Sequence, residues 1–264
     1  MKTLINTFTA QKWKLAYRVV RITLLVGILK FAVHYAGIEF LPLSSLFTAI
    51  ISANIFLIGF LITGVLSDYK ESEKLPGELA VSLEAITDEL SIMYQSKKNK
   101  IIKQGIEHTY FLASSINDWF HKKVRTATVL EGIQGYNDYF LAFEPLTQAN
   151  FIVRMKQEQT TLRRIITRIH SIRETSFNEA GYAIAEIISF LLIVGMIFLK
   201  LEPFYENVFF VIFVSFILIY MVMLIKDLDN PFGYYEEDSL SQEVSLKPLI
   251  DVQARIKGLS TKIK

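Results

Sequence analysis

The chain has 264 residues, of which 52% are hydrophobic and 20% charged, and its mean hydropathy is +0.34. This composition is too apolar for an ordinary soluble protein of this length. Cysteine is absent, which excludes a disulfide framework, a thiolate metal site and a cysteine nucleophile, while the net charge of +2 says little about partners.

The first apolar segment, residues 22–41, follows a basic N-terminal stretch that carries Lys2, Lys12, Lys14, Arg18 and Arg21. This excess of cations predicts a cytoplasmic N-terminus. Lys30 and His34 interrupt the segment four residues apart and share one helix face. We expect that face to meet other helices, with Asn54 as one possible partner of Lys30, or Lys30 to reach outward. Attraction of permeant anions by Lys30 is the alternative.

The second apolar segment, residues 41–66, contains no charged residue. Its 26 residues are enough to cross a hydrocarbon core of about 30 Å as a helix. The short link 37–42 before it has no cation, as expected of an outside loop. The segment is therefore predicted to return to the cytoplasm and to continue into water through the polar run 67–76.

One stripe of the second segment combines aromatic and hydroxyl side chains. Ser52, Phe56 and Phe60 recur every fourth residue, with Thr48 and Thr63 near the same side. Facing a symmetry axis, such a stripe forms rings of small hydroxyls and aromatic constrictions. It supplies four candidate pore-lining residues, Ser52, Phe56, Phe60 and Thr63. In the alternative interpretation, which spacing alone does not exclude, the two phenylalanines pack against a neighbouring helix.

The region 68–180 is charged and follows a helical period, which predicts an all-helical cytoplasmic bundle. Amphipathic helices are expected near 79–93, 102–120, 126–143 and 146–175. The last carries Arg154, Lys156, Arg163, Arg164, Arg168 and Arg173. These cations suit a solvated face, or electrostatic contact with ions or lipid headgroups, better than nucleic acid.

Nothing in the sequence indicates an enzyme. His108, His121 and His170 lie on different predicted helices without metal-ligand spacing. Phosphate-binding glycine loops and the nucleophile elbow are absent.

Two further apolar segments, 181–199 and 207–225, flank a predicted outside turn at 200–206. Four crossings place both termini in the cytoplasm. The expected architecture is an all-α polytopic membrane protein with four transmembrane helices and a cytoplasmic helical bundle. Its regions are 1–67 (transmembrane helices 1 and 2), 68–180 (the bundle), 181–226 (helices 3 and 4) and 227–264 (a cytoplasmic C-terminal segment).

An oxygen-rich stretch follows the fourth crossing. Its carboxylates and amide are the ligands that hard cations prefer, although their spacing is not that of an EF-hand. The candidate metal ligands are Asp227, Asn230, Glu236, Glu237 and Asp238. The alternative is a helix stop with solvated acidic residues.

Three motifs resemble the bestrophin family. The run 59–76, with Gly59-Phe60 and Leu75-Pro76, is similar to the second transmembrane segment of bestrophins. Asn230-Pro231-Phe232-Gly233 with its acidic cluster resembles the motif that closes their transmembrane domain, and 245–249 resembles the tail of bacterial members. The resemblance implies a homopentamer in which Phe56 and Phe60 line the pore neck. Ser52 stands where the family commonly has an aliphatic residue.

In animal bestrophins the acidic cluster clasps calcium, and Asn230 matches that motif directly. Asp227 stands where those proteins have an amide, so Ca²⁺ is a possible ligand and no cofactor is required.

These observations predict an oligomeric channel for monovalent anions such as chloride, in the plasma membrane of a bacterium. The second segment has no carboxylate to form the acidic ring common in cation pores, and phenylalanine edges are electropositive. The expected partners are further copies of the chain, the lipid bilayer and permeant ions, without nucleic acid. A monovalent cation channel of the same architecture and a non-conducting membrane scaffold or signalling protein remain as alternatives.

Overall fold

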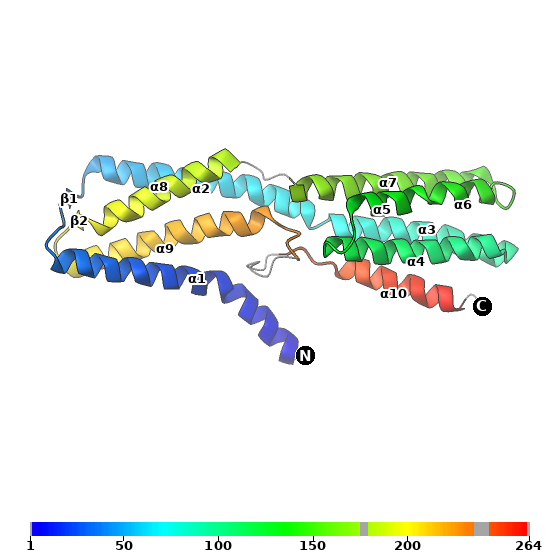
Figure 1. Ribbon diagram of the computed structural model, residues 1–264, viewed down its shortest axis with the longest axis horizontal. Coiled ribbons are helices and arrows are strands. Elements are labelled where there is room, and N and C mark those ends of the chain that lie inside the picture. Colours follow the sequence, from blue (N-terminus) through cyan, green and yellow to red (C-terminus); the bar gives the residue numbers. More distant parts are fainter. Residues whose placement is uncertain (1, 175–178, 235–242, 263–264) are drawn as a thin grey trace. The chain divides into compact units, whose positions relative to one another are not determined.

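The chain is almost entirely helical in the computed structural model, which describes residues 2–174, 179–234 and 243–262, with side chains from Trp13 onward (Figure 1). The all-α fold class is thereby confirmed. In chain order the elements are α1 (Lys2–Tyr35), β1 (Leu41–Pro42), α2 (Ser45–Ser72), α3 (Leu75–Lys97), α4 (Lys100–Phe120), α5 (Thr126–Gln134), α6 (Tyr136–Phe143), α7 (Ala149–Glu174), α8 (Glu179–Ile197), β2 (Leu199–Lys200), α9 (Phe204–Asp229) and α10 (Lys247–Lys262).

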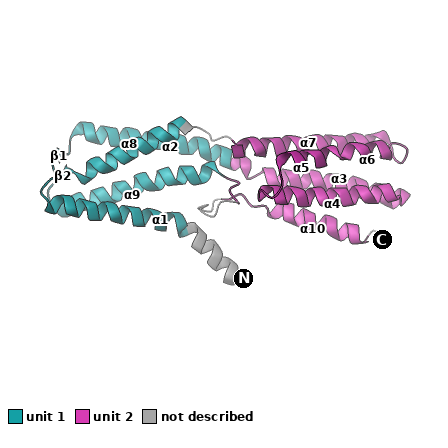
Figure 2. Cartoon of the chain, in the orientation of Figure 1, with its two compact units in different colours: residues 1–69, 176–230, 238–242 teal, residues 70–175, 231–237, 243–264 magenta. Residues whose placement is uncertain are grey.

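The chain divides into two compact units (Figure 2). Of the described residues, unit 1 holds 2–69 and 179–230, and unit 2 holds 70–174, 231–234 and 243–262.

Unit 1 is a bundle of α1, α2, α8 and α9. α1 runs along α9 and also meets α8, and α8 packs on α9. The approach of α1 to α9 is close, since a Cβ atom on Gly27 would lie 3.2 Å from Cδ1 of Ile212. All four helices contribute to one apolar core, whose members include Val26, Ile58, Leu61, Val65, Leu192, Met196, Val211 and Leu218.

A two-residue parallel pairing joins the links at one end of unit 1. β1 lies between α1 and α2, β2 lies between α8 and α9, and Leu41 pairs with Leu199. The amide of Phe40 also donates to the carbonyl of Phe198 at 3.2 Å. The two links, far apart in sequence, are thus held side by side.

Three helical segments of the described chain are long and apolar enough to span a bilayer. They are Ser45–Lys97, which contains α2 and α3, Ala180–Ile197 and Phe204–Asp229. α1 is not among them, because its C-terminal stretch, residues 18–35, contains three charged side chains. These are Arg18, Arg21 and Lys30. The fourth crossing, and with it the cytoplasmic position of both termini, stays a prediction.

Unit 2 contains α3, α4, α5, α6, α7 and α10. α3 packs against α4, α7 and α10, and α10 also packs against α4. The apolar residues predicted for the inner face of α3 are buried, namely Leu79, Leu83, Ile86, Leu90 and Met93. Amphipathic spacing therefore located this core correctly.

Two predicted boundaries in unit 2 are wrong. The helix expected over 126–143 is two helices, which meet at Gly135. At this junction the side chain of His108 lies so close that a Cβ on Gly135 would be 3.1 Å from its Cε1 atom. The helix expected from Leu146 begins at Ala149, after a turn in which the amide of Leu146 donates to the carbonyl of Phe143 at 2.8 Å.

Two buried hydrogen bonds position α6 and α7 in this unit. The Tyr136 hydroxyl donates to Oγ1 of Thr109 at 2.9 Å, and the Gln159 amide donates to the carbonyl of Ile133 at 2.6 Å. Burial raises the pKa of the Tyr136 hydroxyl far above its usual value, so the group stays protonated.

Candidate functional site

α2 has one buried face and one face that the described part of the chain leaves uncovered. Asn54, Ile58, Leu61 and Val65 are at most 2% exposed. The Asn54 amide donates to Oγ of Ser189 at 2.9 Å, which fixes the orientation of α2 against α8. These contacts determine which face of α2 is buried, and the opposite face is exposed.

The uncovered face carries all four candidate pore-lining residues. Phe56 is 78% exposed and Phe60 is 68% exposed, and Ser52 and Thr63 are exposed as well. No helix of the described chain covers the two phenylalanines. The alternative interpretation, that they pack against a neighbouring helix, remains open for a helix of another copy. Their role in a pore stays a prediction, because a single copy of the chain encloses no pore.

The hydroxyl groups on this face bond to the α2 backbone. Thr48, Ser52 and Thr63 donate to the carbonyls of Ser44, Thr48 and Gly59 at 3.2, 3.0 and 2.9 Å. Their hydrogens are therefore engaged, and the face presents hydroxyl oxygens and aromatic rings.

The exposed faces of the other spanning helices have a different composition. Apart from Tyr205 in the first turn of α9, their large exposed hydrophobic side chains have no polar group, namely Ile184, Ile187, Phe190 and Leu191 on α8 and Phe209, Phe210 and Phe213 on α9. Such apolar faces suit contact with lipid tails. A lipid-facing surface does not require the hydroxyl groups that α2 presents beside its aromatic rings. The uncovered face of α2 thus differs in composition from the exposed faces of α8 and α9.

Lys30 is fully buried at the end of unit 1 that carries the strand pairing. Its Nζ atom lies 2.6 Å from Oε1 of Glu39 and 3.2 Å from the carbonyl of Ile197, and it also donates to the carbonyl of Leu199. Its partner is therefore Glu39 rather than Asn54, and it does not reach outward. An enclosed and paired charge adds little to the attraction of anions.

His34 completes this cluster. Its Nδ1 atom lies 3.1 Å from Oε2 of Glu39, and its ring stacks on Phe204 with centroids 3.7 Å apart. Burial acts to raise the pKa of the Glu39 carboxyl, but its hydrogen bonds with Lys30 and His34 outweigh this and hold the pKa below its usual value. The cluster joins α1, the link after it, β2 and α9.

The predicted metal site is described only in part. Asp227 and Asn230 lie at the end of α9, and Glu236, Glu237 and Asp238 lie outside the described residues. Within the described part of the chain, no group of three or more His, Asp or Glu side chains is arranged to hold a metal ion. Ca²⁺ binding at this site stays a prediction.

Two polar contacts near the same end of α9 were not predicted. The Tyr182 hydroxyl donates to Oδ1 of Asp229 at 2.8 Å, and Nζ of Lys226 lies 2.7 Å from Oε1 of Glu186. Both join α8 to α9. The sequence signal for such contacts is a pair of polar residues, one near the start of an apolar helix (α8) and one near the end of the next (α9).

Most cations of α7 have partners within unit 2. Arg154 lies 3.1 Å from Glu89, and the Arg168 guanidinium donates to both carboxylate oxygens of Glu71 at 2.9 and 3.0 Å. Arg173 lies over the ring of Trp119 at 5.0 Å. Such exposed pairs contribute little to stability, and the choice between a solvated face and ion or lipid electrostatics stays open.

Comparison with known proteins identifies the fold. No protein-family model matches the chain, and no curated protein matches its sequence. Among solved structures, a bacterial bestrophin homolog from Klebsiella pneumoniae matches with a TM-score of 0.77 and 12% identity, covering 93% of this chain and 98% of that one. A single-substitution variant of that homolog matches with a TM-score of 0.74 and 13% identity, over 90% and 97% of the two chains. A further structure, described as a membrane protein with one substitution, matches with a TM-score of 0.71 and 14% identity, over 97% and 98%.

The structural matches confirm the expected resemblance at the level of the fold. With its apolar helices, the chain is an all-helical, multi-pass membrane protein of bestrophin-like fold.

Proposed function

We propose that this protein is an oligomeric channel for monovalent anions such as chloride, with a pore lined by α2 from several copies of the chain. The observation that carries the proposal is the uncovered face of α2, where Phe56 and Phe60 are 78% and 68% exposed beside the hydroxyls of Ser52 and Thr63. Bestrophins, whose fold the chain shares, are ion channels.

Assembly is part of the proposal. A single uncovered helix face cannot enclose an aqueous path, so α2 helices from several copies must surround a common axis. The resemblance to bestrophins implies five copies. Native mass measurement in detergent tests this point, and a monomeric mass would remove the pore.

Anion preference rests on the phenylalanines and on the absence of carboxylates. A phenylalanine ring is electropositive at its edge, and rings that point edge-on toward the axis favour a partly dehydrated anion. α2 has no acidic residue between Ser45 and Ser67 to form a cation-selective ring. Lys30 and the paired arginines of α7 are not needed for the preference.

The second candidate is a monovalent cation channel of the same architecture. The observation that favours it is that Ser52 and Thr63 donate their hydroxyl hydrogens to the α2 backbone, which leaves oxygen acceptors on the face. A reversal potential measured in a salt gradient separates the two candidates. Agreement with the chloride equilibrium value supports the proposal, and agreement with the cation value rejects the anion preference.

Ion flux into liposomes from purified full-length protein tests conduction itself. Phe56→Ala with Phe60→Ala removes both aromatic constrictions and should change flux by at least about threefold. The matched control is Phe209→Ala with Phe213→Ala, which removes two exposed phenylalanines of α9 and should leave flux within about twofold of the parent. If the protein conducts nothing, or if the α2 pair leaves flux unchanged, the scaffold alternative is favoured.

A further inference from the structure

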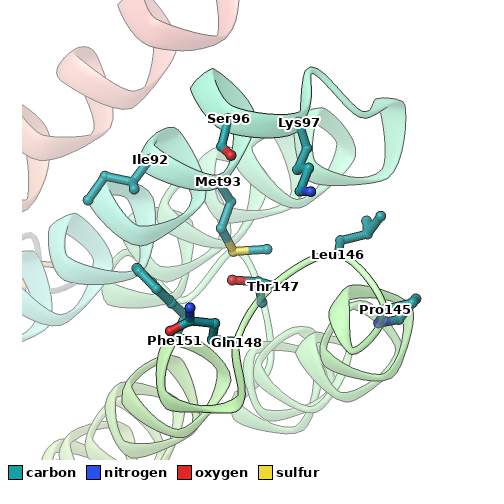
Figure 3. Close-up of a pocket in the computed structure, with 9 residues that line it drawn as sticks. All are labelled: Ile92, Met93, Ser96, Lys97, Pro145, Leu146, Thr147, Gln148 and Phe151. Atoms are coloured by element: carbon teal, nitrogen blue, oxygen red, sulfur yellow. The ribbon is translucent and has the colours of Figure 1, made fainter.

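A pocket of about 410 Å³ lies within unit 2, between the last turns of α3 and the start of α7 (Figure 3). α3 contributes Met93, Ser96 and Lys97, and the link after α6 with the first turn of α7 contributes Leu146, Thr147 and Phe151. The volume falls within the range of small-molecule sites, about 300–1,000 Å³. Nothing in the proposed channel activity requires this pocket.

The interior of the pocket is apolar on one side. Met93 is 3% exposed, Leu146 and Phe151 are half-buried, and all three line the pocket. The thioether of Met93 lies near the centre of the pocket (Figure 3). Methionine adapts to irregular apolar shapes and makes favourable contacts with aromatic rings. This surface suits a short alkyl chain or a ring.

Polar groups line the same pocket. The hydroxyls of Ser96 and Thr147 and the ammonium of Lys97 point into the same space (Figure 3). Hydroxyls and an ammonium are the donors that bind a carboxylate, and the charge of the ammonium strengthens these hydrogen bonds.

The pocket lining carries a single charge, and it is positive. Lys97 is the single charged residue among those that line it, and within the described chain its ammonium has no ion-pair partner. Glu89, four residues before Met93 on α3, is bound by Arg154 at 3.1 Å and is not available to Lys97. Lys97 and Ser96 are exposed to solvent at the edge of the pocket. A bound anion would pair with the ammonium of Lys97, and a neutral ligand would gain no such ion pair.

We propose that this pocket binds a small amphipathic carboxylate. The alkyl or aryl part lies on Met93, Leu146 and Phe151, and the carboxylate accepts hydrogen bonds from Lys97, Ser96 and Thr147.

The absence of cysteine in the chain allows a direct test with the full-length protein in detergent. Gln148→Cys places a single thiol at the pocket wall, at a lining residue that contributes none of the proposed hydrogen bonds. The rate of its reaction with neutral methyl methanethiosulfonate reports access to the pocket. Hexanoate is the probe, and hexanamide is its neutral counterpart of similar size. We expect hexanoate to slow the reaction at least about threefold, and hexanamide to slow it much less.

Two controls test whether protection is specific to the pocket and to the charge of Lys97. Thr128→Cys places a thiol on the exposed surface of α5, outside the pocket, and its reaction should not change with hexanoate. In the Gln148→Cys background, Lys97→Gln should abolish protection and Lys98→Asn should preserve it. Asparagine tolerates the φ of 44° at residue 98, so this variant removes a neighbouring charge without strain.

Rates with and without hexanoate are compared within each variant, because loss of Lys97 also changes the reactivity of the thiol. The proposal would be overturned if hexanamide protected the thiol as well as hexanoate does. It would also be overturned if hexanoate slowed the reaction of the Thr128→Cys variant equally, or if Lys98→Asn abolished protection. Absence of any protection by hexanoate would overturn it as well.

Discussion

Nζ of Lys30 lies 2.6 Å from Oε1 of Glu39, and this ion pair closes one end of unit 1. Lys30 is fully buried, and the Glu39 side chain is 10% exposed. Because Lys30 also donates to the carbonyls of Ile197 and Leu199, the pair joins α1 to the link that follows α8. A buried cation is tolerated here because its charge and its hydrogens are satisfied.

Removal of the Glu39 charge should therefore destabilise the protein. Glu39→Gln leaves a buried ammonium without its counter-charge, a change that typically costs about 3–5 kcal/mol. We expect a clear fall in the thermal unfolding temperature in detergent. The control is Glu202→Gln in the link after β2, where the side chain is exposed and little change is expected. Equal falls in both variants would contradict a specific role for the pair.

The same pair should make stability depend on pH. The pKa of Glu39 is held below its ordinary value of 4.5, so its contribution is fully present above about pH 4.5 and is lost as pH falls through the lower folded-state pKa. The unfolding temperature of the parent should fall across this acid range. In Glu39→Gln the fall should be smaller, and an identical pH profile would contradict the assignment.

The pairing of Lys30 could not be predicted from sequence, although its burial against other elements could. A charge within an apolar helix requires a partner, and this follows from the cost of desolvation. The identity of the partner depends on the β1–β2 pairing, which brings the carbonyls of Ile197 and Leu199 to Lys30. Asn54 was the nearest polar candidate in an apolar helix, but it bonds to Ser189.

By contrast, the position of Ser52, Phe56 and Phe60 on one face of α2 was predictable, because residues four apart share a helix face whatever the tertiary structure. That this face is uncovered was not predictable from spacing. The break at Gly135 was not predicted, and the close approach of the His108 side chain to this residue is a tertiary contact that local spacing does not reveal. The assignment of a face to lipid or to other copies of the chain also exceeds what local spacing determines.

The hydrogen bond between Tyr136 and Thr109 should show an asymmetry between its two partners. Thr109→Val leaves the fully buried Tyr136 hydroxyl without its acceptor, at a cost of about 1–3 kcal/mol. Tyr136→Phe removes the donor itself, and Thr109 keeps its bond to the carbonyl of Gly105 at 3.0 Å, so the loss should be smaller. Thermal unfolding of both variants in detergent measures the difference, and a greater loss for Tyr136→Phe would contradict this account.

Topology can be measured by cysteine labelling, because the parent chain has no cysteine. With four crossings, Ile38→Cys and Glu202→Cys should react with an impermeant maleimide from outside intact cells, and Lys98→Cys should react only after permeabilisation. Ile38 is chosen in place of Glu39 because it is 51% exposed and does not belong to the ion pair. Labelling of the Lys98→Cys variant from outside, or failure of the Ile38→Cys variant to react there, would contradict four crossings with cytoplasmic termini.

The most direct test of the proposed pore is chemical modification of α2 during ion conduction. Phe56→Cys and, as the control, Phe213→Cys each place one thiol at an exposed phenylalanine of a spanning helix, at 78% and 52% exposure. With purified protein in liposomes, a charged methanethiosulfonate reagent should reduce chloride flux through Phe56→Cys by most of its value and leave Phe213→Cys unchanged, because a pore narrows where its lining is modified. Measurable flux that is insensitive to modification at residue 56, or equally sensitive at residue 213, would contradict an α2-lined pore.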